Sequence, residues 1–257
     1  MAEKIAKKEK HRIRILSYNI HKGFSSGNRK FILKGIREAL RETHPEVVFL
    51  QEVLGNHDGH RKRIQDWPTE SQFEFLADEL WPHFAYGRNA VYTMGHHGNA
   101  ILSKHPILFF ENIDISTNHF ERRGILHGMI KIPGISRSVH LLCVHLGLME
   151  AERLTQIKKL CSRVHSHVPD QDPLIIGGDF NDWTGKASHL LEKSLHLEEL
   201  FKKVQGQYAR TFPSWLPALK LDRLYCRGFE VKSAECLSTP KWAGLSDHVA
   251  LLGEVGI

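Results

Sequence analysis

The stretch 173–182 combines features that suit a binding site for a cation or a phosphate group. An apolar, strand-like run ends in Gly177 and Gly178, and oxygen-bearing side chains follow directly. Because side chains along an extended chain alternate between its two sides, Asp179 and Asn181 point to the same side. A carboxylate and an amide placed together can bind a hard cation, whereas the same residue types also form ordinary polar turns.

Polar side chains recur next to other apolar runs along the whole chain. They are Asn19 after 12–19, Glu52 after 46–52, His145 after 139–145, Asp222 near the start of 220–225, and Asp247 and His248 before the last apolar run. In sheets covered by helices, binding sites form where the ends of several strands converge. Each of these side chains alone could be a turn residue, but their recurrence favours one shared site.

The periodicity of the apolar residues predicts the elements that carry these side chains. Helical spacing predicts helices over about 30–43, 70–80 and 149–166. Several strands in the middle of the chain follow one another directly, at about 84–91, 98–103, 107–115, 125–132 and 138–145. This mixture predicts two packed sheets covered by helices rather than one doubly wound parallel sheet. The segments 54–69 and 205–219 are interpreted as loops beside the site, for substrate contact or as solvated surface.

The composition is that of an ordinary globular protein and sets limits on its partners. The chain has 257 residues, of which 41% are hydrophobic and 25% charged, and this length suits one large core. We expect a basic lead-in at residues 1–10 and a single domain over 11–257, acting as a monomer. The net charge of +6 is compatible with a polyanionic partner or an anionic membrane surface.

The sequence also favours a particular compartment. No apolar stretch approaches the length of a transmembrane helix, and the first residues are charged, unlike a signal peptide. The four cysteines show no paired spacing, and Cys143 and Cys161 lie on apolar positions of a strand and a helix. This inventory is typical of a reduced, cytoplasmic protein.

Six short motifs, taken in order, resemble those of a known superfamily. They are Ser17-Tyr18-Asn19-Ile20-His21, Leu50-Gln51-Glu52-Val53, Gly98-Asn99-Ala100-Ile101-Leu102-Ser103, Val144-His145-Leu146, Gly178-Asp179-Phe180-Asn181 and Ser246-Asp247-His248. The ordered set resembles the serial motifs of the endonuclease/exonuclease/phosphatase superfamily, the DNase I-like hydrolases, from about Arg12 to Leu252. The Gly-Asp-Phe-Asn motif and the terminal Ser-Asp-His are the specific parts of this match.

The resemblance implies a fold, a reaction and a cofactor. The expected fold is a four-layer α/β/β/α sandwich of two packed mixed β-sheets flanked by helices, with the site at one edge of the sheets. The expected reaction is hydrolysis of a phosphodiester or phosphomonoester by in-line attack of water, assisted by Mg²⁺, for which Mn²⁺ can substitute. Glu52 is the first choice of metal ligand, with Asn19 and Asp247 completing the metal side.

The resemblance further implies catalytic roles for five residues. His248 is expected to face the phosphate, oriented by Asp222 on its other ring nitrogen. Asp179 is expected to position or deprotonate the attacking water, and Asn181 to donate to a phosphoryl oxygen. His145 is expected to donate to the phosphate from the other side. Mechanisms in the superfamily differ on whether the aspartate or the histidine is the base, and the sequence leaves this open.

Three further residues are candidates for contact with the substrate. Many members carry an arginine that meets the substrate phosphate at the place of Arg122 and Arg123, and either could enter the site or lie on the surface. Asn99 is expected to line the pocket or to cap a strand.

The sequence and the resemblance indicate a phosphate ester as the substrate. The chain opens with Tyr18-Asn19 where abasic-site endonucleases usually have Trp-Asn, and Asp182-Trp183 stands where inositol 5-phosphatases have a basic motif. Nucleic acid, DNA or RNA, is slightly favoured as the substrate, and a phospholipid or another small phosphodiester is the alternative. A catalytically inactive phosphate-binding module is disfavoured, because every mapped catalytic position carries a competent residue.

Overall fold

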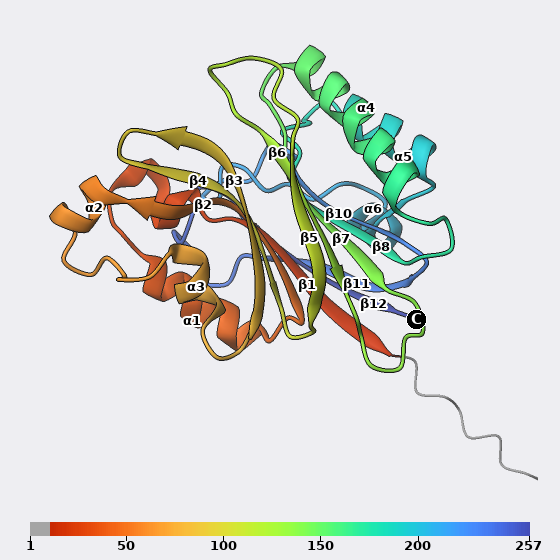
Figure 1. Cartoon of the computed structure of the whole chain (residues 1–257), viewed down its shortest axis with the longest axis horizontal. Helices are drawn as coiled ribbons and strands as arrows, with labels where there is room; N and C mark the ends of the chain where they lie inside the picture. Colours follow the sequence, from red (N-terminus) through yellow and green to blue (C-terminus); the bar gives the residue numbers. More distant parts are fainter. Residues whose placement is uncertain (1–10) are drawn as a thin grey trace, which may run out of the picture.

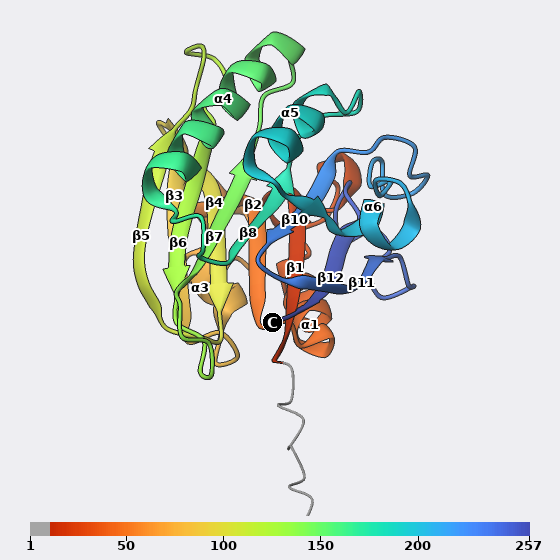
Figure 2. The same cartoon turned by 90° about the vertical axis from the view of Figure 1, so that its right-hand side faces the viewer.

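The structure, a computed structural model, describes residues 11–257, and the expected lead-in at 1–10 lies outside the described residues. Within them, two six-stranded sheets pack face to face (Figures 1 and 2). Sheet I contains, in spatial order, β11 (Glu230–Leu237), β12 (Ala250–Gly256), β1 (Arg12–Asn19), β2 (Val47–His57), β4 (Gly95–Ser103) and β3 (His83–Tyr92). Sheet II contains β5 (Ile107–Asp114), β6 (Gly124–Ile130), β7 (Val139–His145), β8 (Leu174–Asp179), β10 (Asp222–Arg227) and β9 (Glu198–Glu199).

Both sheets are mixed, and helices cover their outer faces. β1 runs parallel to β2 and β7 runs parallel to β8, while the other neighbouring strands are antiparallel. α1 (Leu33–Thr43) and α3 (Gln72–Ala77) pack on sheet I, and α4 (Glu150–His167) and α5 (Lys186–Leu195) pack on sheet II (Figure 1). The predicted four-layer α/β/β/α sandwich is therefore confirmed.

Three apolar clusters hold the layers together. The central cluster lies between the sheets and includes Phe49 and Ile101 from sheet I and Leu141 and Ile175 from sheet II, all fully buried. The other two clusters join each sheet to its helices. Burying one such side chain contributes about 1.5–3 kcal/mol, so the clusters give the strand ends a rigid base.

The helices predicted from periodicity are present, and three further helices were not predicted. α2 (Asp58–Arg63) follows β2 directly, and α6 (Leu200–Gln205) lies against β10 and β11. α5 begins where the carboxylate of Asp182 accepts the backbone N–H groups of Gly185 and Ser188. Two short 3₁₀ turns, η1 (His21–Gly23) and η2 (Ser26–Asn28), lie between β1 and α1. No helix among residues 11–257 is long and apolar enough to cross a bilayer.

The structure corrects the sequence-based interpretation of the region around Glu52. β2 does not end there but continues to His57, and α2 follows, so 54–69 is not one continuous loop. Glu52 lies in a bulge where the pairing with β4 shifts register between Leu50 and Val53, and its φ is +57°. A bulge inserts an extra residue and re-aims a side chain, and an apolar run gives no sign of it.

Candidate active site

The strand register brings the predicted polar residues to one edge of the sandwich. β7 and β8 are parallel and pair His145 with Asp179, while antiparallel β10 pairs Asp222 with the same Asp179. β1 contributes Asn19 from the other sheet, and its side-chain amide donates to Asp179 Oδ2 over 3.1 Å. The loop before β12 places His248 against this group. Asp179 is therefore in contact with polar side chains from both sheets.

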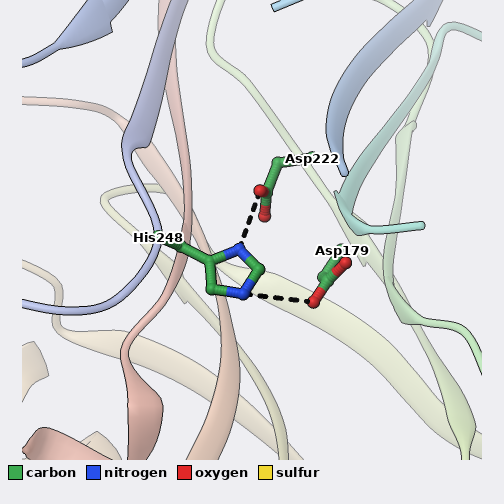
Figure 3. A group of neighbouring side chains, drawn as sticks. All are labelled: Asp179, Asp222 and His248. Atoms are coloured by element: carbon green, nitrogen blue, oxygen red, sulfur yellow. Dashed lines mark hydrogen bonds and ion pairs between the residues drawn. The ribbon is translucent and has the colours of Figure 1, made fainter. Parts of the chain in front are cut away.

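His248 lies between two buried carboxylates (Figure 3). Its Nδ1–H donates to Asp222 Oδ2 over 2.9 Å, and its Nε2 lies 3.8 Å from Asp179 Oδ2. Burial alone would lower the pKa of His248, but the charges of Asp222 and Asp179 outweigh burial and raise that pKa to about 10. The two carboxylates therefore favour the positively charged imidazole, with a proton on both nitrogens.

Asp179 is surrounded by hydrogen-bond donors in a dry environment. Its Oδ1 accepts the backbone N–H of Asn181 over 3.0 Å, and its Oδ2 faces Nε2 of His145 at 3.4 Å. Burial raises the pKa of Asp179 to about 6, against the opposing charge of His248 and with the support of Asp222. A carboxylate held near neutral pKa is suited to accept a proton from a bound water.

His145 is held in the opposite protonation state to His248. The guanidinium of Arg123 donates to His145 Nδ1 over 3.2 Å, so the ring proton must reside on Nε2. Burial and the charge of Arg123 lower the pKa of His145 well below its ordinary value. Glu121 pairs with Arg123 and fixes the guanidinium. His145 is thus a neutral imidazole that points a hydrogen-bond donor at Asp179.

Glu52 is kept ionised at the edge of this group. Asn19 Nδ2 donates to Glu52 Oε1 over 3.2 Å, and the Lys22 ammonium lies 3.2 Å from Oε2. Burial opposes ionisation of Glu52, but the positive charge of Lys22 and the hydrogen bond from the Asn19 amide favour the carboxylate and lower the pKa of Glu52. Asn19 therefore bridges Glu52 and Asp179 and orients both carboxylates.

Glu52 and Asp247 form an acidic pair that fits a divalent cation. Both side chains are about one-fifth exposed, and both face His21, whose Nδ1 lies 3.4 Å from Asp247 Oδ2 and 4.0 Å from Glu52 Oε2. Mg²⁺ needs only one or two carboxylates and keeps several waters, so a partly open pair of this kind suits it.

A second cluster has metal-ligand spacing but fits a cation less well. Asp179, Asp222 and His248 bring their side-chain ligand atoms within 4.8 Å of one another. Both ring nitrogens of His248 already face a carboxylate, since Nδ1 is hydrogen-bonded to Asp222 Oδ2 at 2.9 Å and Nε2 lies 3.8 Å from Asp179 Oδ2. Glu52 and Asp247, which are partly exposed, are the residues that could take up a cation from solvent.

His21 and Lys22 belong to the site but were not predicted as site residues. Their φ values are +45° and +58°, and Gly23 continues the turn with φ of +79°. Each left-handed non-glycine residue costs about 1–3 kcal/mol, and such strain concentrates at functional sites. The turn places Lys22 next to Glu52 and His21 next to Asp247. Apart from Gly23, the sequence carries no sign of this conformation.

The remaining predicted residues take different places. Asn99 is fully buried, and its Nδ2 donates to Gly124 O over 3.0 Å and to Cys143 O over 3.3 Å, which ties sheet I to sheet II. Arg122 is half-exposed and lies 3.7 Å from Asp114. Asn181 Nδ2 donates to Leu146 O over 2.9 Å.

The predicted loop 205–219 contributes one aromatic side chain to the site. The ring of Phe212 lies 5.1 Å from the ring of His248, so it covers one side of the imidazole. Ser214 fixes the His248 loop, since its N–H donates to Asp247 O over 2.7 Å and its hydroxyl donates to Ser246 O over 2.6 Å. Trp215, by contrast, is exposed.

The buried group of Asp179, Asp222 and His248 lies at one edge of the four-layer sandwich. The sequence pattern of the Endonuclease/Exonuclease/phosphatase family matches residues 16–248, and the chain belongs to this family. Its members are generally hydrolases, nucleases or phosphatases, and they typically use divalent metals.

The chain is also similar to a curated protein and to solved structures. The chain is 46% identical to the uncharacterized protein YbhP of Escherichia coli strain K12 over 242 residues, which cover 94% of this chain and 95% of that protein. An endonuclease/exonuclease/phosphatase from Beutenbergia cavernae has a similar structure, with a TM-score of 0.76, 19% identity, and coverage of 96% of this chain and 72% of that one. D. rerio TDP2 complexed with a single-strand DNA product gives a TM-score of 0.73, 18% identity and coverage of 96% and 99%. These two likenesses show the fold.

Proposed function

We propose that this protein is a Mg²⁺-dependent phosphodiesterase that cleaves its substrate by in-line attack of water. One observation carries the proposal: Asp179, a buried carboxylate with a raised pKa, faces a neutral His145 and a protonated His248. This set offers one proton acceptor and two hydrogen-bond donors around a single position. A proton acceptor and hydrogen-bond donors of this kind suit the hydrolysis of a phosphodiester, whereas a passive phosphate-binding site has no need of the acceptor.

Glu52 and Asp247 would hold the metal, and Asn19 would keep Glu52 in place. A bound Mg²⁺ polarises a phosphoryl oxygen and stabilises the leaving oxygen. Lys22 lies 3.2 Å from Glu52, and His21 Nδ1 lies 3.4 Å from Asp247.

Each group around Asp179 has a distinct role in the proposed reaction. Asp179 accepts the proton of the attacking water, because His248 carries protons on both nitrogens and cannot accept another. The cation of His248 and the Nε2–H of His145 donate to the phosphoryl oxygens, where negative charge increases in the transition state. Asp222 keeps His248 oriented and protonated. Both donors lie near the same oxygen of Asp179, at 3.4 Å for His145 Nε2 and 3.8 Å for His248 Nε2, so a phosphate bound there could contact both.

The pH dependence should report these two charges. We expect kcat/KM to rise with pH through about 6, as Asp179 loses its proton, and to fall near pH 10, as His248 loses its proton. Asp222→Asn should move the falling limb to lower pH, because it removes the charge that most strongly favours the imidazolium. A pH–rate profile of both proteins, with circular dichroism at each pH, measures this. A falling limb that does not move would contradict the assigned role of Asp222.

Two substrate classes have support. The net charge of +6 and the DNA-bound structure of the neighbouring TDP2 support a nucleic acid. A phospholipid is the second candidate, because exposed apolar side chains stand on segments that flank the site. They are Phe120 before β6, Leu148 and Met149 after β7, Trp183 after β8, and Trp215 before β10.

A substrate panel tests the proposed function. The protein is incubated with Mg²⁺ or Mn²⁺ and an aryl phosphodiester, plasmid DNA, abasic DNA, RNA or phospholipid vesicles, alongside Asp179→Ala and His248→Ala. We expect metal-dependent turnover of at least one substrate and loss of turnover in both variants. Absence of turnover on all of them, or turnover that survives both substitutions, would remove the proposal.

A further inference from the structure

A cleft of about 230 Å³ lies beside Glu52, between the two sheets. From sheet I it is lined by Glu52 and His97, and η1 contributes Lys22. From the segment between β5 and β6 it is lined by Phe120, Glu121, Arg122 and Arg123. Neither Asp222 nor His248 lines it, so the cleft adjoins the Glu52 flank of the site and not the His248 flank.

The residues that line this cleft carry more positive than negative charge. Lys22, Arg122 and Arg123 are cations, of which Arg123 pairs with Glu121 and Lys22 pairs with Glu52. Glu52, the other acid, is the proposed metal ligand. A divalent metal on Glu52 would add positive charge to the cleft and leave it without a balancing anion.

Lys22 is the cation of the cleft that pairs with the proposed metal ligand, Glu52. Its ammonium lies 3.2 Å from Glu52 Oε2, the carboxylate that a metal would use. A metal held by this oxygen would compete with the ammonium of Lys22, which already lines the cleft and would then be available to another anion. The left-handed backbone at His21 and Lys22 holds the side chain at this position at a cost in stability.

Unpartnered polar atoms in the cleft also indicate a ligand. Nε of Arg123 and Nδ1 of His97 are buried and have no hydrogen-bond partner among residues 11–257. Buried polar groups normally have partners, and exceptions are often explained by a missing ligand or ion. Phe120 stands fully exposed beside them and offers an apolar face to the rest of a ligand.

We infer that this cleft binds a second anionic group of the substrate, and that Lys22 selects phosphodiesters that carry such a group. The inference rests on the proposed phosphodiesterase function. It predicts that one of the two groups esterified to the scissile phosphate lies in this cleft, and that this group carries a further phosphate or carboxylate. Arg122, half-exposed and paired with Asp114 at 3.7 Å, also lines the cleft and adds positive charge to it.

Turnover of two matched aryl phosphodiesters tests the selectivity. They are 4-nitrophenyl phenyl phosphate and its analogue with a phosphonate on the phenyl ring, which share the leaving group and differ in one anionic group. The wild type should prefer the phosphonate analogue by roughly tenfold or more in kcat/KM, the value of one charge-assisted hydrogen bond. Lys22→Met should remove this preference through KM, and Lys22→Arg should retain it. Lys193→Met, which removes a charge from an exposed position on α5, should behave as the wild type.

A binding measurement separates this inference from the proposed function. Isothermal titration in Mg²⁺ compares phenylphosphonate with 1,4-phenylenediphosphonate, which cannot be hydrolysed. The bisphosphonate should bind the wild type more tightly than the monophosphonate, and Lys22→Met should bind the two equally. Equal binding by the wild type, or a preference that survives in Lys22→Met, would overturn the inference even if both esters are hydrolysed. If neither ester is hydrolysed with any metal, the proposed function fails, and the titration alone decides whether the cleft selects a second anion.

Discussion

Asp179→Asn should lower kcat for a phosphodiester by roughly 10³- to 10⁴-fold, the upper part of the range for loss of a general base. The amide has the shape of the carboxylate and can still accept the backbone N–H of Asn181, but it cannot accept a proton from water. Stopped-assay turnover at saturating Mg²⁺ measures the change.

Two controls make this result specific. Circular dichroism and thermal melting should show that Asp179→Asn remains folded, and Mg²⁺ affinity should change little, because Glu52 and Asp247 are the proposed ligands. His145→Gln provides a matched comparison in which a donor is replaced and the base is kept, and it should lose less activity. A variant Asp179→Asn that retains more than about one-tenth of the wild-type kcat would show that another group activates the water.

Glu52→Gln should weaken Mg²⁺ binding by more than roughly 100-fold, since loss of a partner that merely supports a ligand already costs 10–100-fold. The amide keeps the size of the side chain and its contact with Asn19 but removes the charge that attracts the cation. Titration of Mn²⁺ by electron paramagnetic resonance measures the affinity directly, without reliance on turnover.

A carboxylate outside the site serves as the matched control. Glu46 is also a glutamate, and it directly precedes β2, the strand that carries Glu52. Its carboxylate lies 2.7 Å from Nε2 of His105. Glu46→Gln should leave Mn²⁺ binding unchanged. Unaltered binding in Glu52→Gln would move the metal away from Glu52, and the cluster of Asp179, Asp222 and His248 would become the alternative place for it.

Much of the site was predictable because strand ends fix relative position. The apolar runs that end at His145 and Asp179 are neighbouring parallel strands, and their register alone brings the two side chains together. The start of β10 at Asp222 has the same effect from the antiparallel side. Apolar periodicity likewise predicted α1, α3 and α4, since each buries one continuous stripe against a sheet.

Other parts depend on local backbone geometry that no pattern of residue types reveals. Glu52 is aimed by a bulge within β2, although the sequence suggested that the strand ends there. His21 and Lys22 enter the site through consecutive left-handed residues, which are rare for side chains of this size. The choice between Arg122 and Arg123 also required the structure, where Arg123 contacts His145 and Arg122 lies near Asp114.

The most direct test is the hydrolysis of bis(4-nitrophenyl) phosphate by the wild type and by Asp179→Asn, measured in Mg²⁺, after chelation, and after Mg²⁺ is restored. We expect turnover by the wild type that disappears with the chelator and returns with the metal, and no comparable turnover by the variant under any condition. Wild-type hydrolysis that persists in the chelator, or equal hydrolysis by Asp179→Asn, would contradict a metal-dependent phosphodiesterase in which Asp179 activates the water.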